Sequence, residues 1–177
     1  MLGRRGLLLG LATLPLGCRR AVASETGGWR AARWGMSGAA LDAAFGQTVR
    51  RIDPPMAFGH LIAERLIPGV RLGGRHFVAF LQHPPERDGL AQVLLQFYSS
   101  RPAPEDFAAV RRALIGELGR PQQRNVDTDY SADFPSFETA VLWHTAGTRV
   151  TLRYVDPNME PYSGVRKSLT VRYTPAA

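Results

Sequence analysis

Acidic and hydroxyl side chains recur at alternate positions between residues 127 and 138, in a spacing similar to that of a calcium-binding loop. A twelve-residue calcium loop takes ligands from positions 1, 3, 5, 7 and 12, and the last of these is a bidentate glutamate. In this chain those positions are held by Asp127, Asp129, Ser131, Asp133 and Glu138. The match is incomplete, because Ala132 stands where glycine makes the sharp turn, Pro135 occupies position 9 and Glu138 begins an expected strand. Calcium is therefore a candidate cofactor, and an ordinary acid-rich linker is the alternative.

The histidines do not show the spacing of a metal site. They are His60, His76, His83 and His144, and no pair has the i, i+4 spacing of ligands on one helix. His76 and His83 are an odd number of residues apart, so they would point to opposite faces of one regular strand. We interpret all four as isolated strand or loop residues.

No sequence motif of nucleophilic catalysis is present. The chain has neither a G-x-S-x-G nor an S-x-x-K pattern. Catalytic triads are nevertheless defined by geometry and not by chain order. A small hydrolase that uses His60 or His144 with an acid and a hydroxyl therefore stays open as an alternative to a protein without catalytic activity.

Arginine and threonine residues alternate with apolar residues near the C-terminus. Arg149, Thr151 and Arg153 lie out of phase with Val150, Leu152 and Tyr154, and Thr170 and Arg172 lie out of phase with Leu169, Val171 and Tyr173. Because side chains of a strand alternate between its two faces, the polar set should share the outer face of a sheet. We predict a binding surface formed by Arg149, Thr151, Arg153, Thr170 and Arg172 for an acidic partner or anionic lipid head groups. A solvated outer face that keeps the sheet soluble is the alternative interpretation.

Two helices are expected from capping signals. The first follows Ser37, a favourable N-cap, and ends at Gly46. The second begins at Pro104 and ends before Gly119, with its apolar stripe formed by Phe107, Val110, Leu114 and Leu118.

Six strands are expected from alternating and β-branched residues, over residues 60–67, 70–82, 90–98, 138–145, 148–155 and 166–174. Pro68-Gly69, residues 84–89 and Ala146-Gly147 supply turns between them. The order of a helix and three strands, twice, is consistent with a structural duplication. We predict an α+β fold with an antiparallel sheet of about six strands and both helices on one face.

The first 23 residues have the three parts of an export signal. Arg4 and Arg5 precede an apolar stretch that ends at Gly17, and Ala21-Val22-Ala23 forms a small-residue cleavage site. A membrane-spanning helix is the weaker alternative, because about 20 apolar residues are needed to cross a bilayer and this stretch is interrupted at Cys18-Arg19-Arg20. We predict an export signal over 1–23, a flexible tether over 24–32 that lies outside the core, and a single domain over 33–177.

The signal is similar to two bacterial types. The paired arginines resemble those of twin-arginine signals. Leu14 to Cys18 is similar to a lipobox, in which Cys18 would become the acylated first residue of the mature protein, although Pro15 departs from that pattern. Cleavage after Ala23 is slightly favoured, and lipidation at Cys18 stays the alternative. The expected location is the periplasm or envelope, with a lipid anchor as the sole attachment to the membrane.

Charge and cysteine content bear on the partner and on the stability of the fold. The net charge of +7 falls to +3 after cleavage, since four of the 22 basic and none of the 15 acidic residues lie in 1–23. This modest excess argues against nucleic acid as a partner. Cys18 is the single cysteine, so the fold must be stable without an internal disulfide.

Several short segments resemble bacterial exported envelope proteins. They are Trp34-Gly35-Met36-Ser37, Asp88-Gly89-Leu90, Leu118-Gly119-Arg120-Pro121, Trp143 and the segment from Thr148 to Leu152. That group is similar in architecture to β-lactamase-inhibitor-protein-like folds and to small outer-membrane-assembly lipoproteins. The resemblance implies a non-enzymatic protein that binds a protein or cell-envelope partner.

Overall fold

The computed structural model describes residues 27–129, 136–157 and 166–176. The predicted export signal and Cys18 therefore lie outside the described residues. Within them, no helix is both long and apolar enough to cross a membrane.

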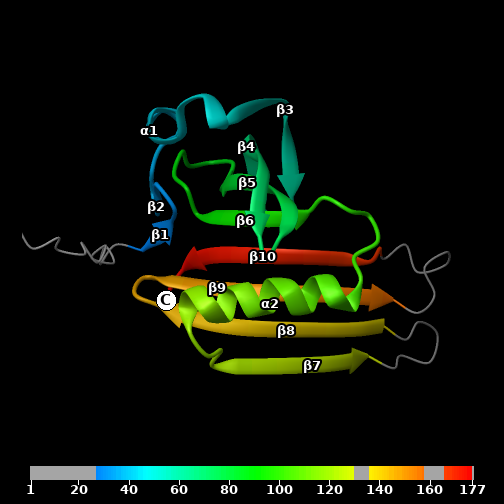
Figure 1. The fold of residues 1–177 in the computed structure, drawn as a ribbon. Coiled ribbons are helices and arrows are strands. Elements are labelled where there is room, and N and C mark those ends of the chain that lie inside the picture. Colours follow the sequence, from blue (N-terminus) through cyan, green and yellow to red (C-terminus); the bar gives the residue numbers. More distant parts are fainter. Residues whose placement is uncertain (1–26, 130–135, 158–165, 177) are drawn as a thin grey trace, which may run out of the picture.

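One antiparallel sheet of eight strands forms the body of the protein (Figure 1). Its order is β3-β4-β5-β6-β10-β9-β8-β7. The strand bounds are β3 Arg50–Phe58, β4 Leu61–Leu72, β5 Arg75–His83, β6 Gln92–Phe97, β7 Gln123–Asp129, β8 Ser136–Thr145, β9 Thr148–Pro157 and β10 Ser168–Pro175. The α+β class and the antiparallel sheet are confirmed, and the expected number of strands, about six, is too low.

The sheet consists of two meanders of four strands that meet where β6 pairs with β10. A helix precedes each meander: α1 (Gly38–Phe45) leads into β3 and α2 (Pro104–Leu118) leads into β7. The repeating unit is thus one helix and four strands, not the predicted three. The missing member in each half is an edge strand, β3 or β7.

The turn predicted at Pro68-Gly69 is wrong. β4 runs through it from Leu61 to Leu72, and the pairing of β4 with β5 shifts register between Ile67 and Val70. The chain reverses at Gly73 and Gly74 instead. Proline in a strand is tolerated at such a bulge, because a bulge leaves a backbone N–H without a ladder partner in any case.

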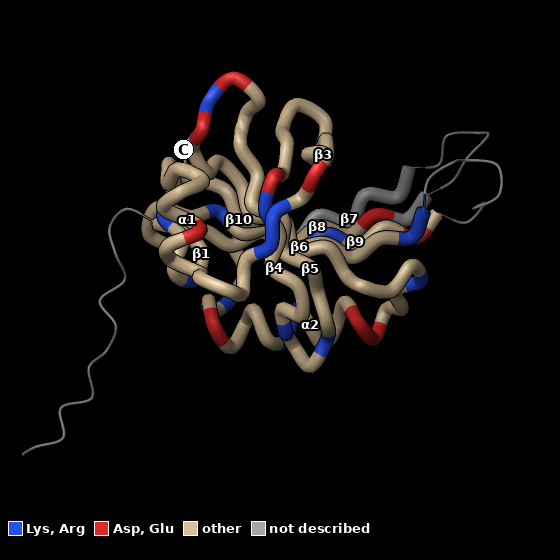
Figure 2. The backbone as a smooth tube through the Cα atoms, turned by 90° about the horizontal axis from the view of Figure 1, so that it is seen from above, with Lys and Arg blue, Asp and Glu red and all other residues tan. Residues whose placement is uncertain are grey.

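Both helices contribute to the main core on one face of the sheet. Val110 and Leu114 of α2 are fully buried, and Leu41 of α1 belongs to the same cluster of apolar residues. Each helix starts as its capping residues predict: the Ser37 hydroxyl accepts from the Ala40 N–H, and the Ala103 N–H donates to Asp106 Oδ2 at 2.9 Å. Figure 2 shows α2 on one side of the strand layer and β3 toward the other. We call the face of the sheet opposite α2 the outer face.

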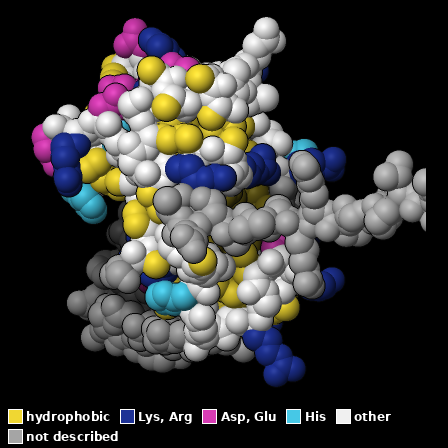
Figure 3. Space-filling view, turned by 90° about the vertical axis from the view of Figure 1, so that its left-hand side faces the viewer, with side chains coloured by type: hydrophobic (Ala, Val, Ile, Leu, Met, Phe, Trp, Pro, Cys, Tyr) yellow, Lys and Arg dark blue, Asp and Glu magenta, His cyan; other side chains and the backbone are white. Residues whose placement is uncertain are grey.

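The prediction of a tether over 24–32, outside the core, is wrong for the residues from 27 onward. Two short strands, β1 (Gly28–Trp29) and β2 (Ala32–Arg33), pair with each other, and Trp29 is only 6% exposed. The Trp29 ring contacts the rings of Phe45 and Tyr173, with centroid distances of 6.1 and 6.2 Å. The Gly28 N–H also donates to Thr148 Oγ1 at 2.9 Å. Figure 3 faces this end of the molecule and shows apolar side chains between basic ones.

The outer face of the first meander carries a smaller apolar cluster. Ala63, Phe80 and Leu94 are buried there, and Ile52 and Phe58 of β3 pack against them. The Phe58 and Phe80 ring centroids are 4.9 Å apart. β3 can fold over this face because its pairing with β4 is interrupted between Arg51 and Met56. On the second meander, the outer face of β9 and β10 instead carries arginine and threonine side chains.

Candidate functional site

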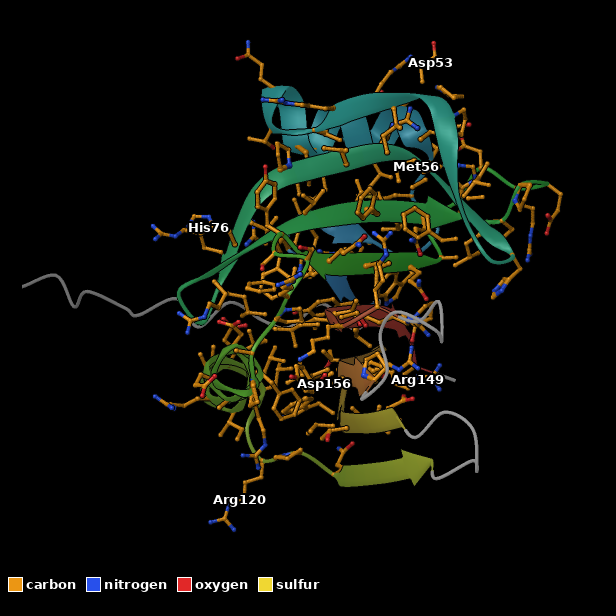
Figure 4. The ribbon with its side chains drawn as sticks, turned by 90° about the vertical axis from the view of Figure 1, so that its right-hand side faces the viewer. Asp53, Met56, His76, Arg120, Arg149 and Asp156 are labelled. Atoms are coloured by element: carbon orange, nitrogen blue, oxygen red, sulfur yellow. The ribbon has the colours of Figure 1, made fainter. Side chains whose placement is uncertain are left out.

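The five residues predicted as a binding surface lie together on the outer face of β9 and β10. Thr170 stands opposite Arg153, and Arg172 stands opposite Thr151. Thr174 of β10 stands opposite Arg149, which extends the same face by one pair. Figure 4 shows Arg149 on the side of the sheet away from α2. We name the set Arg149, Thr151, Arg153, Thr170 and Arg172 the arginine patch.

The strands present these side chains outward because their alternate residues fill the main core. Val150, Leu152 and Tyr154 of β9 are buried under the helices, as are Leu169, Val171 and Tyr173 of β10. A shift of one residue in either strand would bury the arginines, which fixes the orientation of the patch strongly. The alternation expected from the sequence is therefore confirmed.

One arginine of the patch is held by an acid. Arg153 donates through Nε to Glu138 Oε1 and through Nη2 to Glu138 Oε2, the latter at 2.9 Å. These hydrogen bonds hold the pKa of Glu138 below its usual range and raise the pKa of Arg153. The charge of Arg153 is thus largely balanced within the protein.

The charge of Arg172 is not balanced by an acid among the described residues. Its side chain has no hydrogen bond or ion pair with any of the described residues. Partial burial lowers the pKa of Arg172, and the nearby charges of Arg153 and Arg149 lower it further. Arg149 makes one neutral contact, from Nε to Thr174 Oγ1 at 3.3 Å. Arg172 and Arg149 therefore supply positive charge that an anionic ligand would stabilise.

The residues of the predicted calcium loop are only partly described. Asp127 and Asp129 belong to β7, and Glu138 stands opposite Asp127 in β8. Ser131 and Asp133 lie outside the described residues. Glu138 uses both carboxylate oxygens to accept from Arg153. In the described part of the chain, no group of three or more His, Cys, Asp or Glu residues could hold a metal ion. Calcium binding stays a prediction.

The histidines lie in separate places. His60 is in the turn between β3 and β4, His76 and His83 are at the two ends of β5, and His144 is in β8. His83 Nδ1 lies 2.9 Å from the Pro84 carbonyl oxygen and 3.0 Å from that of Arg87. Over the described ranges, the side chains of His60 and His144 make no hydrogen bond or ion pair. The hydrolase alternative requires such a contact.

A hollow that sequence reasoning missed lies where β6 ends and β10 begins. Its volume is about 280 Å³, and it is lined by Gln96, Phe97, Tyr98, Ser99, Ser100, Arg166, Lys167, Ser168 and Leu169. The alternation of β6 placed Tyr98 with Gln92 and Gln96 on the outer face, but nothing in the sequence indicated which residues of β10 would face it. We name this hollow the Tyr98 pocket.

No protein-family model, curated protein or solved structure matches this chain. The resemblance to exported envelope proteins accordingly stays a prediction. Because function resides in the site and not in the fold, it is inferred from the arrangement of the side chains.

Proposed function

We propose that this protein is a non-enzymatic binding protein of the bacterial periplasm or envelope, which receives an anionic surface of a protein or cell-envelope partner on the arginine patch. The observation that supports this proposal is the unpaired guanidinium of Arg172 between Arg149 and Arg153. Arg149 and Arg172 are like charges on adjacent strands that no described acid balances, so their repulsion costs free energy unless an anion is present. A bound partner of opposite charge would relieve this repulsion and so gain binding free energy.

The site offers directional as well as electrostatic recognition. A guanidinium presents its N–H groups in a planar fork that fits carboxylate and phosphate oxygens. The hydroxyls of Thr151 and Thr170 stand among the arginines and both donate and accept hydrogen bonds. Envelope location is supported by the export signal predicted over residues 1–23.

A capture experiment with two triple variants tests the proposal. The patch variant carries Arg149→Ala, Arg153→Ala and Arg172→Ala. The control variant carries Arg87→Ala, Arg112→Ala and Arg120→Ala, which removes the same charge from exposed arginines of the β5–β6 loop and of α2 and its C-terminal end. Both variants and the unmodified chain are used to capture partners from native envelope extracts at increasing salt, and to bind vesicles with and without phosphatidylglycerol.

The expected result is a partner that the unmodified chain and the control variant retain and the patch variant loses, with affinity that falls as salt rises. A hydrogen bond to a charged group contributes about 1.5–3 kcal/mol, so Arg172→Ala alone should weaken binding roughly tenfold to one-hundredfold. Retention of the same partner by the patch variant would refute the proposal. Binding to anionic vesicles without a protein partner would identify lipid as the envelope component.

A further inference from the structure

The Tyr98 pocket contains an exposed aromatic ring. Tyr98 is 82% exposed, and within the described residues only Met56, at 42%, is another exposed large apolar side chain. Burying an aromatic side chain of this size normally stabilises a protein by a few kcal/mol. A ring left in water beside a hollow instead presents a flat surface with a hydroxyl at its rim, which suits a ligand that is apolar on one face and polar at its edge.

Three serine hydroxyls share the pocket with the Tyr98 ring. Ser99, Ser100 and Ser168 all line the pocket. The Ser99 hydroxyl accepts from the Arg101 N–H at 3.2 Å, which leaves its own hydrogen available to donate. Gln96 also lines the pocket and adds an amide. These groups both donate and accept, as recognition of ligand hydroxyls requires.

The pocket also contains two cations, of which one is already paired. Lys167 Nζ lies 2.9 Å from Asp156 Oδ1, so that ammonium group is balanced by an acid. Arg166 is exposed, and no described residue pairs with its side chain. The site therefore has one uncompensated positive charge, which fits a ligand with a single anionic group.

We propose that the Tyr98 pocket binds an acidic monosaccharide unit, a sugar ring that carries one carboxylate or phosphate group. Tyr98 stacks against the apolar face of the ring, the three serines and Gln96 bond its hydroxyls, and Arg166 binds the anionic group. The volume of about 280 Å³ is near the lower limit for small-molecule sites and suits a ligand of one ring.

The pocket is distinct from the arginine patch. Gln96 stands opposite Thr170, so the two sites adjoin along β10, but none of the three patch arginines lines the pocket. This inference goes beyond the proposed function, because it assigns a small-molecule ligand and does not require the protein or envelope partner.

Calorimetric titration of the purified full chain tests the inference with four probes: D-glucuronate, D-glucose 6-phosphate, D-glucose and inorganic phosphate. The expected result is that one or both acidic sugars bind with a Kd on the order of 1 mM. D-Glucose and inorganic phosphate should bind at least about tenfold more weakly, because each supplies only half of the interactions. Comparison of the two acidic sugars distinguishes a carboxylate from a phosphate as the anionic group.

Variants assign the roles within the pocket. Tyr98→Ala should weaken binding of the acidic sugar about fivefold, through loss of the stacking surface. Arg166→Gln should weaken it about tenfold or more and remove the preference over D-glucose. Arg112→Gln, which removes an exposed arginine of α2, and the triple patch variant should both bind as the unmodified chain does. Circular dichroism confirms that each variant is folded.

Three results would overturn the inference: no heat with any probe, inorganic phosphate binding as tightly as the acidic sugars, or unchanged affinity in Tyr98→Ala. None of these bears on the arginine patch. Loss of binding in the triple patch variant with retention in Arg166→Gln would likewise overturn it, since the anion would then occupy the patch.

Discussion

The contact between Asp42 and Arg65 attaches α1 to the sheet and allows a quantitative prediction. Arg65 Nε donates to Asp42 Oδ1 at 2.8 Å and Nη2 donates to Oδ2 at 3.2 Å, while the Arg65 side chain is only 11% exposed. Its other acidic contact, with Glu64, is longer, at 3.4 Å. The substitution Asp42→Asn removes the negative charge and replaces one accepting oxygen with an NH2 donor, so the nearly buried guanidinium keeps one neutral acceptor and the weak contact with Glu64.

The expected cost of Asp42→Asn is about 2 kcal/mol in the free energy of unfolding at pH 7. Removal of one partner from a fully buried ion pair costs about 3–5 kcal/mol. The cost is smaller here because the Asp42 side chain is 29% exposed and remains partly solvated. Arg51 also donates to Asp42, at 2.9 Å, but its side chain is 77% exposed. Arg51→Ala should accordingly cost less than about 0.5 kcal/mol and serves as the matched control.

Urea unfolding of the three proteins between pH 7 and pH 2 provides the measurement. The hydrogen bonds from Arg65, and then those from Arg51, lower the pKa of Asp42 to about 2 from its ordinary value of 3.8. Because the folded value lies below the unfolded one, the stabilisation is present above about pH 4 and is lost as the pH falls toward 2. The advantage of the unmodified chain over Asp42→Asn should shrink over that range. An Asp42→Asn variant within 0.5 kcal/mol of the unmodified chain at pH 7, on the order of the effect of a neutral surface change, would refute the reasoning.

Two further predictions concern close contacts in the fold. Gly73 has φ +58°, and a Cβ there would lie 2.6 Å from the Ala109 carbonyl oxygen of α2. Gly73→Ala should therefore lower the free energy of unfolding, measured by thermal denaturation, by about 2–3 kcal/mol. Gly116→Ala is the control, because it lies in α2 with no atom within 4 Å of the added Cβ and should stabilise the protein by about 0.5–1 kcal/mol. Thr148→Val removes the hydroxyl that accepts from the Gly28 N–H and from Trp34 Nε1, at 2.9 and 3.2 Å, and should cost about 2 kcal/mol. It should also speed amide hydrogen exchange in residues 28–33, and unchanged exchange there would contradict the attachment of β1 and β2 to the core.

The elements with local signals were predictable from the sequence. Ser37 and Gly46 mark the ends of α1, and Pro104 and Gly119 mark those of α2. The hairpin of β8 and β9 turns at Ala146-Gly147 as expected, with Thr145 opposite Thr148. These features depend on caps and turns, which a few neighbouring residues determine.

The edge strands were not predictable in this way. β3 is almost entirely exposed and contains Pro54 and Pro55, while β7 has Val126 as its single aliphatic residue. An edge strand pairs on one side only and buries little apolar surface, so alternation and β-branched residues are weak in it. The same limit explains Trp29, which lies in a polar, Gly-rich segment and joins the main core through contacts that include Phe45 and Tyr173.

The candidate site also has a predictable part and an unpredictable part. Alternation predicts which residues of β9 and β10 face outward, and it gives the arginine patch its members. It does not reveal that Glu138 pairs with Arg153 and not with Arg172. Nor does it reveal that Tyr98 and Arg166 line one pocket at the ends of β6 and β10. The Glu138–Arg153 pair lies within the β8–β9 hairpin but depends on the conformations of two long side chains, which alternation does not specify. The pocket depends on the pairing of β6 with β10, two strands that are far apart in the chain.

The two halves of the sheet have the same order of elements but use their outer faces differently. In the first half, β3 folds over the face and Phe58 packs on Phe80, so this half buries apolar residues on both sides of the sheet. In the second half, β7 pairs with β8 over seven residues without a register shift, so it lacks the break that lets β3 bend over the sheet. On the outer face of β9 and β10, Arg149 and Arg172 have no acidic partner among the described residues. The arginine patch, on which the proposed binding function depends, lies entirely on strands of this second half.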